Sequence, residues 1–153
     1  YYIGGTVTSP EHQDLGYLIN TVARHLKQSM AAELSPLELT PQQAAVLLAA
    51  SVSETPPTIT ETASRLGMDR PTMTGVVERL IRDGWVQTTP NPRDGRSRLV
   101  RNTEKATSAL PFIRKASALV GDRLLEGFTA KDAQMLRLLL NRIAETAIAS
   151  ENE

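Results

Sequence analysis

The sequence predicts a mainly helical α+β fold in which long helices at both ends of the chain flank a smaller unit of short helices and one hairpin. Three observations predict it. Between residues 58 and 83 a short capped helix, a glycine turn and a second capped helix follow one another. An arginine-rich hairpin pattern comes next, over residues 85–101, and long amphipathic segments stand on either side. Together these features indicate a winged helix-turn-helix domain with N- and C-terminal dimerisation helices.

A first helix is expected at about residues 10–34. Ser9 is a favoured N-cap residue, and Pro10 suits the first helical position. Apolar residues then recur at helical spacing, namely Leu15, Leu18, Ile19, Val22, Leu26, Met30 and Leu34. The pair Ser35-Pro36 ends this helix.

The next two helices begin with capping boxes, in which a threonine and the side chain three residues later cap each other. Thr40 and Gln43 open a second helix that runs to about Ser51, and the prolines in the loop 53–57 exclude a helix there. Thr58 and Glu61 open a short third helix at about 59–66.

Gly67 stands where a helix stop needs positive φ, and Asp69 is the cap of a fourth helix at about 69–83. Gly84 ends that helix. Strands are expected at about 85–89 and 97–101, with a turn over the turn-forming residues 91–95. The hairpin, or wing, spans about 90–98.

Two more helices complete the chain. Thr103 caps a fifth helix at about 104–127, which ends at Gly127 and in which Pro111 should cause a kink or remove one hydrogen bond. Thr129 and Asp132 open a sixth helix at about 130–149. We therefore expect a winged helix-turn-helix DNA-binding region at 36–103, and a helical dimerisation region formed by 10–35 with 104–150.

The composition excludes several classes of protein. Hydrophobic residues make up 41% and charged residues 22% of 153, which is typical of a globular chain. The chain has no cysteine, and neither histidine lies in a metal-ligand pattern, so no cofactor or metal is expected. The longest nearly unbroken apolar run, residues 44–52, is too short to span a bilayer. With no signal-peptide pattern at the start, we expect a cytoplasmic protein without a membrane partner.

The net charge is zero, but its distribution is uneven. Residues 1–64 carry two basic and six acidic side chains, and residues 104–153 carry seven of each sign. Residues 65–103 carry eight arginines against four acidic side chains, so the positive excess lies in one segment. Arginine has a planar fork of donors that suits phosphates and guanine edges. This segment is therefore the candidate contact with double-stranded DNA.

The candidate contacts lie in two places. The fourth helix should enter the major groove, because it has an apolar face for the domain and a polar face for base edges. The wing should enter the minor groove, whose negative potential attracts arginine. A solvated helix face and a surface hairpin with an Asp94–arginine pair are the simpler alternatives. The predicted DNA-binding residues are Arg70, Pro71, Thr72, Thr74, Arg79, Arg93, Asp94, Arg96 and Arg98.

Several stretches resemble the multiple-antibiotic-resistance regulator (MarR) family: residues 39–43, 63–74, 77–80, 83–86 and above all the wing stretch Asn91-Pro92-Arg93-Asp94-Gly95-Arg96-Ser97-Arg98. The resemblance covers about residues 10–150. It implies a homodimer in which the terminal helices form the interface and each winged domain binds half of a palindrome. It also implies that Asp94 orients an arginine at the tip, that Arg96 enters the minor groove, and that a small aromatic or phenolic effector releases the protein from DNA.

Three positions depart from that pattern. Gly75 stands where many relatives carry a longer, often basic residue, Thr62 replaces a common leucine, and the glycine frequent after the wing is missing from residues 102–106. The absence of cysteine excludes the family's thiol-based peroxide sensors. No residue is assigned to an effector site, because surface or core roles suit His25, Tyr17 and Trp85 better.

The long terminal helices also predict a dimer. The apolar stripes of the long terminal helices exceed what one small domain covers, although the helices could instead pack on each other within a monomer. A two-fold symmetric reader gains the specificity that one half-site lacks. We expect a sequence-specific, ligand-responsive regulator, most simply a repressor. The alternatives are a winged-helix protein-interaction module, and an enzyme, which the lack of any nucleotide-binding or nucleophile–base motif disfavours.

Overall fold

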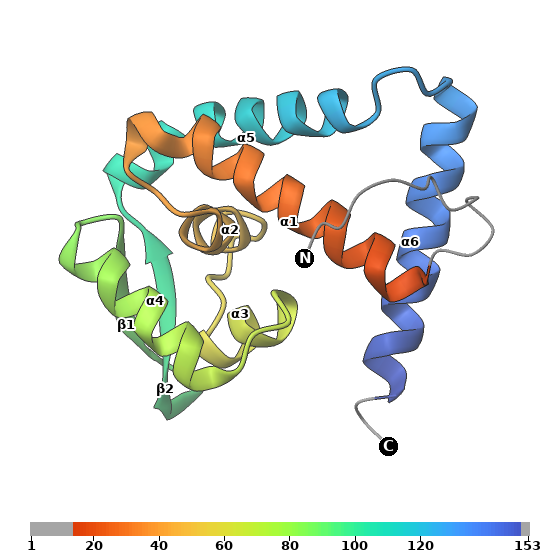
Figure 1. Ribbon diagram of the computed structural model, residues 1–153. Coiled ribbons are helices and arrows are strands. Elements are labelled where there is room, and N and C mark those ends of the chain that lie inside the picture. Colours follow the sequence, from red (N-terminus) through yellow and green to blue (C-terminus); the bar gives the residue numbers. More distant parts are fainter. Residues whose placement is uncertain (1–13, 151–153) are drawn as a thin grey trace. The chain divides into compact units, whose positions relative to one another are not determined.

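The computed structural model describes residues 14–150, with side chains described as far as residue 147. The chain forms two compact units, one ending at Ser117 and the other beginning at Ala118. Figure 1 shows the helices and strands along the chain. Their bounds are α1 (Leu15–Leu34), η2 (Ser35–Leu37), α2 (Pro41–Ala49), α3 (Ile59–Arg65), α4 (Arg70–Arg82), β1 (Val86–Asn91), β2 (Asp94–Asn102), α5 (Glu104–Leu124) and α6 (Ala130–Ser150).

The first helix begins later than the sequence predicted. Its N-cap is Asp14, whose ψ of 130° is not helical and whose carboxylate accepts a hydrogen bond from the N–H of Tyr17 at 3.3 Å. The expected cap at Ser9 and Pro10 lies outside the described residues. A local acidic cap therefore defines the start of α1 within the described chain.

The capping boxes of α2 and α3 are confirmed. The hydroxyl of Thr40 accepts from the N–H of Gln43 at 3.2 Å, and the Gln43 side chain accepts from the N–H of Thr40 at 2.8 Å. Thr58 and Glu61 make the same exchange at 3.1 and 2.7 Å. The hydrogen bond from the backbone N–H of Thr58 is the largest cause that lowers the pKa of Glu61. Both helices begin where the sequence predicted.

Two glycines end helices as expected. Gly67 has a φ of 60° between α3 and α4, and Gly84 has a φ of 75° after α4. Both are in the left-handed region that glycine adopts without a steric cost. After Gly84, the N–H of Trp85 bonds to the carbonyl of Leu80 at 2.8 Å, which turns the chain sharply into β1. These turns set the direction of α4.

The core lies beneath α2, α4 and the hairpin. Its fully buried side chains include Leu47 from α2, Met73 and Leu80 from α4, and Val100 from β2. Trp85 is also buried, and the rest of the cluster is leucine, valine, isoleucine and alanine. Thr62, fully buried, satisfies its hydroxyl by donating to the carbonyl of Thr58 at 2.8 Å. The threonine therefore leaves no unpaired hydroxyl in the core.

The hairpin turn is shorter than predicted. β1 and β2 are antiparallel, and Asn91 pairs with Asp94, so only Pro92 and Arg93 form the turn and Gly95 lies in β2. The amide side chain of Asn91 explains this, because it accepts from the N–H of Arg93 at 3.0 Å and donates to the hydroxyl of Ser97 at 2.9 Å. These bonds close the turn without a left-handed glycine.

The second unit consists of the end of α5 and α6. Pro111 is accommodated inside α5, which ends at Leu124 instead of Gly127 because a separate turn follows, closed by the bond from Phe128 N–H to the carbonyl of Leu125 at 3.0 Å. α6 begins with the predicted pair, since the N–H of Asp132 bonds to the hydroxyl of Thr129 at 3.2 Å. Within the described helices, none is long and apolar enough to cross a membrane.

Candidate nucleic-acid interface

α4 has one buried and one exposed face. Its buried residues are Met73, Val76, Val77 and Leu80. At roughly 100° per residue, Pro71, Gly75 and Arg82 lie on the opposite face. Arg70 and Arg79 lie on opposite edges of that face, roughly half a turn apart. Of the contact residues predicted on α4, Pro71 therefore lies in the middle of the exposed face, and Arg70 and Arg79 lie at its two edges.

The two threonines of α4 have their hydroxyl hydrogens engaged within the helix. Thr72 donates to the carboxylate of Asp69 at 2.7 Å, and Thr74 donates to the carbonyl of Arg70 at 2.9 Å. What remains on each side chain is a methyl group and acceptor capacity. These groups suit a thymine methyl or the amino group of adenine or cytosine, and they do not suit a phosphate.

The N-terminus of α4 is occupied by its own cap. The carboxylate of Asp69 accepts from the N–H of Thr72 at 2.8 Å as well as from its hydroxyl. The hydroxyl bond, followed by the N–H bond, lowers the pKa of Asp69. The carboxylate of Asp69 already caps this end of α4, so the exposed guanidinium of Arg70 is the group here that suits a phosphate contact.

We expect Asp69→Asn to weaken the dependence of stability on pH in acid. The folded-state pKa of Asp69 is lowered, so its contribution is present above the ordinary pKa and is lost as the pH falls through the lowered value. Asparagine caps a helix about as well as aspartate but does not titrate in this range. Urea midpoints between about pH 5 and pH 2 should therefore fall less in the variant than in the wild type. Parallel curves would contradict this role of Asp69.

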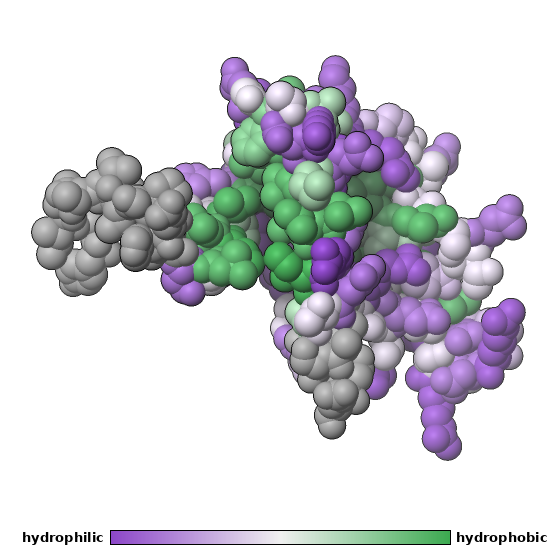
Figure 2. All heavy atoms as spheres, turned by 90° about the vertical axis from the view of Figure 1, so that its right-hand side faces the viewer, coloured by the Kyte–Doolittle hydropathy of each residue, from purple (hydrophilic) through white to green (hydrophobic). Residues whose placement is uncertain are grey.

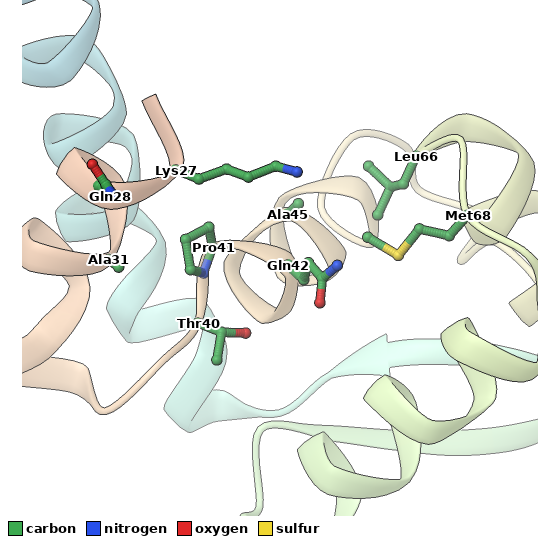
Figure 3. Close-up of a pocket in the computed structure, with 9 residues that line it drawn as sticks. All are labelled: Lys27, Gln28, Ala31, Thr40, Pro41, Gln42, Ala45, Leu66 and Met68. Carbon is green, nitrogen blue, oxygen red and sulfur yellow. The ribbon is translucent and has the colours of Figure 1, made fainter. Parts of the chain in front are cut away.

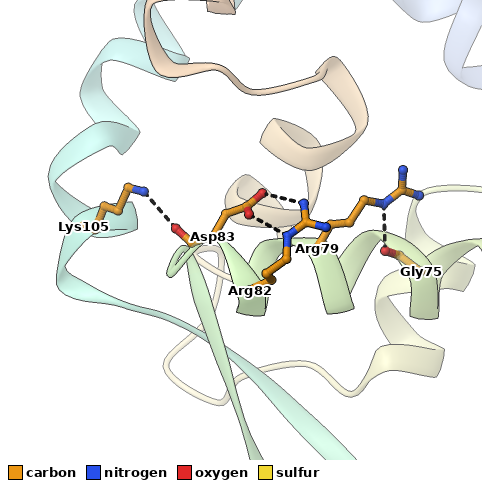
Figure 4. Close-up of polar contacts among 5 residues, drawn as sticks. All are labelled: Gly75, Arg79, Arg82, Asp83 and Lys105. Carbon is orange, nitrogen blue, oxygen red and sulfur yellow. Dashed lines mark hydrogen bonds and ion pairs between the residues drawn. The ribbon is translucent and has the colours of Figure 1, made fainter.

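Gly75 is the unusual residue of α4, because glycine inside a helix costs about 1 kcal/mol relative to alanine. A Cβ at this position would meet only the Nη2 of Arg79, at 3.7 Å, which is an ordinary contact. The Nε of Arg79 donates to the carbonyl of Gly75 at 3.0 Å, so the guanidinium lies along the helix above this glycine (Figure 4). Neither backbone conformation nor core packing requires glycine here.

The C-terminus of α4 is tied to the following elements. Arg82 and Asp83 form an exposed ion pair at 2.9 Å, and the hydrogen bond from Arg82 is the largest cause that lowers the pKa of Asp83. Lys105 of α5 donates to the carbonyl of Asp83 at 2.9 Å (Figure 4) and lies 4.0 Å from the ring centre of Trp85. These contacts hold the end of α4, and no motif in the sequence indicates them.

The predicted DNA-binding residues of the wing occupy different positions in the hairpin. Asp94, Arg96 and Arg98 alternate along β2 and so share one face of the strand, while Arg93 lies in the turn. Arg98 is bound across the hairpin, since its Nε and Nη2 donate to the hydroxyl and carbonyl of Thr88, both at 2.9 Å. Arg96 and Arg93 are exposed at the tip. Asp94 accepts from the backbone N–H of Arg96 at 3.0 Å.

The base of the wing is anchored to the helical part. The N–H of Val100 bonds to the carbonyl of Pro57 at 2.8 Å, and the side-chain amide of Asn102 donates to the carbonyl of Leu47 at 2.9 Å. The wing therefore has a stiff root and a cationic tip. None of these bonds joins residues close in sequence, so only the folded structure reveals them.

A pocket of about 470 Å³ lies between α1, the start of α2 and the turn before α4 (Figure 3). The side chains that make it apolar are Ala31, Pro41, Ala45, Leu66 and Met68. Lys27 of α1 is its one charged lining residue, with the polar Gln28, Thr40 and Gln42 beside it. No sequence pattern indicates this pocket, because its residues come from three segments that only folding brings together. His25 and Tyr17 are exposed on α1, and Trp85 is buried.

The described residues offer no alternative centre for metal chemistry. Across residues 14–150, no group of three or more histidine, cysteine, aspartate or glutamate side chains could hold a metal ion. The functional features of the described chain are thus the exposed face of α4, the wing and the pocket.

Comparisons with known proteins agree with this geometry. The model of the MarR family matches residues 37–97. The multiple antibiotic resistance protein MarR of Escherichia coli is 31% identical over 135 residues, which cover 84% of this chain and 90% of that protein.

Solved structures share the fold. A crystal structure of the reduced form of Escherichia coli MarR superposes with a TM-score of 0.73 and 29% identity, over 86% of this chain and 96% of the other. CouR from Rhodococcus jostii, solved with bound p-coumaroyl-CoA, superposes with a TM-score of 0.79 over 90% of this chain and 96% of the other. At 23% identity, the second comparison shows the fold alone.

Proposed function

The chain belongs to the MarR family of DNA-binding transcriptional regulators, and on that premise we propose that it is a ligand-responsive repressor that binds a palindromic operator as a homodimer. In this proposal α4 lies in the major groove and the wing, residues 90–98, lies in the minor groove. The region 36–103 then binds DNA, and residues 10–35 and 104–150 form the dimer. Such a regulator works on the chromosome, which agrees with the cytoplasmic location expected from the sequence.

The observation that carries the proposal is a set of exposed arginines without acidic partners. Among the described residues, no ion pair joins a carboxylate to Arg70, Arg79, Arg93 or Arg96. All four are exposed, and they lie on the two elements that a winged helix presents to DNA. Unpaired cations at an exposed surface are available for phosphate and base contacts.

The direct test is a binding selection from a random duplex pool at near-physiological salt. A palindrome with half-sites about one helical turn apart is the expected result. Its affinity should fall steeply as salt rises, because bound phosphates release counterions. Salt-dependent binding without an enriched sequence would contradict a sequence-specific reader, and no binding at all would favour a protein-interaction module.

We expect Arg96→Ala to weaken operator binding by about 1–3 kcal/mol. The side chain is exposed near the tip of the wing and makes no ion pair within the described chain, so its removal should leave the fold intact. Lys115→Ala, which removes one charge from an exposed position of α5, is the matched control. Equal affinity of the two variants in a titration of the operator would remove the wing from the mechanism.

The proposed homodimer rests on exposed apolar stripes. On α6, Leu136, Leu139, Leu140 and Ile143 are 36–48% exposed, and Figure 2 shows apolar side chains gathered on that side. On α1, Leu15, Leu18, Ile19, Val22 and Leu26 are 37–59% exposed. An exposed apolar stripe on a helix of this kind is typical of a surface that contacts another protein chain.

The pocket beside α1 is the proposed effector site. Its apolar lining suits a small aromatic or phenolic molecule, and its volume falls in the range typical of ligand sites. The amine of Lys27 would pair with an anionic substituent of that molecule. Met68 and Leu66 line the pocket and also belong to the turn that leads into α4, so a bound molecule contacts the segment that positions α4.

A thermal-shift comparison of aromatic carboxylates with their neutral amides tests this site. At a fixed ligand concentration, a ligand that binds only the folded state raises Tm more when it binds more tightly. The carboxylates should raise Tm more than the amides, and Lys27→Gln should remove the difference. An undiminished preference for carboxylates in Lys27→Gln would place the effector elsewhere.

A further inference from the structure

We propose that Arg79 reads one guanine in each half-site and that Gly75 makes this possible by leaving the space that the Arg79 guanidinium occupies. The inference rests on the proposed function, because it assumes that α4 enters the major groove. It goes beyond that function by naming the base, the side chain that reads it and the residue that determines the specificity.

The side chain of Arg79 is held in one place on α4. Its Nε donates to the carbonyl of Gly75 at 3.0 Å, and its Nη2 lies 3.7 Å from the position that a Cβ of residue 75 would take (Figure 4). A side chain longer than alanine at position 75 would extend into the volume of the guanidinium. Glycine at this position therefore controls where the guanidinium lies.

The position of the guanidinium is favourable for base contacts. A recognition helix contacts base edges mainly from its first turns. Arg79 belongs to the third turn of α4, but its side chain points back toward the N-terminus, and its Nη2 lies 3.7 Å from the Cβ position of residue 75, which belongs to the second turn. The charged group thus lies above the second turn, on the edge of the exposed face that Thr72 shares.

The remaining donors match guanine. The hydrogen bond to Gly75 uses the Nε, and both terminal nitrogens of the fork remain for a ligand. Two parallel donors of this kind pair with O6 and N7 of guanine, a contact that no other base offers in the major groove. The Nε bond also reduces the freedom that the side chain would lose on binding.

Arg82 provides an internal contrast on the same helix. It is also exposed, yet its guanidinium forms the 2.9 Å ion pair with Asp83. Its charge is partly neutralised, and its fork is engaged by a carboxylate of its own chain through two hydrogen bonds. Of these two arginines, Arg79 is the one with a free terminal fork.

The experiment repeats the binding selection with the full chain and three variants: Arg79→Lys, Gly75→Leu and the control Arg82→Lys. The wild type should enrich a palindrome with one invariant guanine per half-site. Arg79→Lys keeps the charge but lacks the fork, so the guanine preference should disappear and affinity for the wild-type site should fall by about 5- to 150-fold for each of its two half-sites. Gly75→Leu should lose the preference at the same base pair, and Arg82→Lys should keep it.

The outcomes distinguish failure of the proposed function from failure of the inference about Arg79 and Gly75. A wild-type selection without a palindrome would overturn the proposed function and this inference with it. A palindrome whose guanine preference survives Arg79→Lys, or survives Gly75→Leu, would overturn the inference alone. Lysine and leucine are both good helix formers, and a thermal melt of each variant verifies that α4 is intact.

Discussion

Leu139→Glu is expected to convert the protein from a dimer to a monomer and to reduce operator affinity by about 1000-fold or more, toward nonspecific binding. Leu139 is 44% exposed in the middle of the apolar stripe of α6. In a two-fold interface the substitution buries two unpaired carboxylates, each at a cost of several kcal/mol. Sedimentation equilibrium at micromolar protein and a titration of the operator measure the two effects.

Asn141→Glu is the matched control for this prediction. Asn141 is also exposed on α6 and lies on roughly the opposite side of the helix from the stripe. The same charge there should leave the dimer and its affinity unchanged. If Leu139→Glu lowers Tm but not the molecular mass, the stripe packs within one chain, and the proposed interface is wrong.

Leu80→Ala is expected to destabilise the domain that holds α4 by about 2–5 kcal/mol. Leu80 is fully buried in the core cluster, so truncation removes apolar contacts and leaves a cavity. Since whole domains are stable by only about 5–15 kcal/mol, DNA binding at elevated temperature should be lost with the fold. Urea unfolding followed by the fluorescence of the buried Trp85, the one tryptophan of the chain, measures the loss.

Ile81→Ala is the neighbouring control for that loss. Ile81 follows Leu80 in the same helix but is 42% exposed, so much of its surface is already in water. Its truncation should cost less than that of Leu80, with alanine restoring part of the loss through helix propensity. A similar cost at both positions would indicate that Leu80 does not carry the packing of α4.

The sequence by itself determined the helices and most of their ends. The helices α2, α3 and α4 are capped by Thr40, Thr58 and Asp69, each of which accepts a hydrogen bond from the backbone N–H three residues later. Two helices end at Gly67 and Gly84, through the positive φ of each glycine. Such interactions join residues within about four positions of each other, so the local sequence is enough to predict them. The arginine-rich segment and the wing stretch were likewise enough, as sequence, to indicate the family.

Only the tertiary structure decided how those pieces are used. In the structure, the side chain of Asn91 closes a turn of the wing that is shorter than predicted. Arg98 bonds to Thr88 across the hairpin, and residues of α1, α2 and the turn before α4 together line the pocket. The structure also places the guanidinium of Arg79 above Gly75. The contacts of Asn91 and Arg79 are local in sequence, but they depend on which way each side chain turns, and the residue pattern does not specify that direction. The bonds of Arg98 to Thr88 and the pocket join segments that are distant in sequence, and only packing brings those segments together.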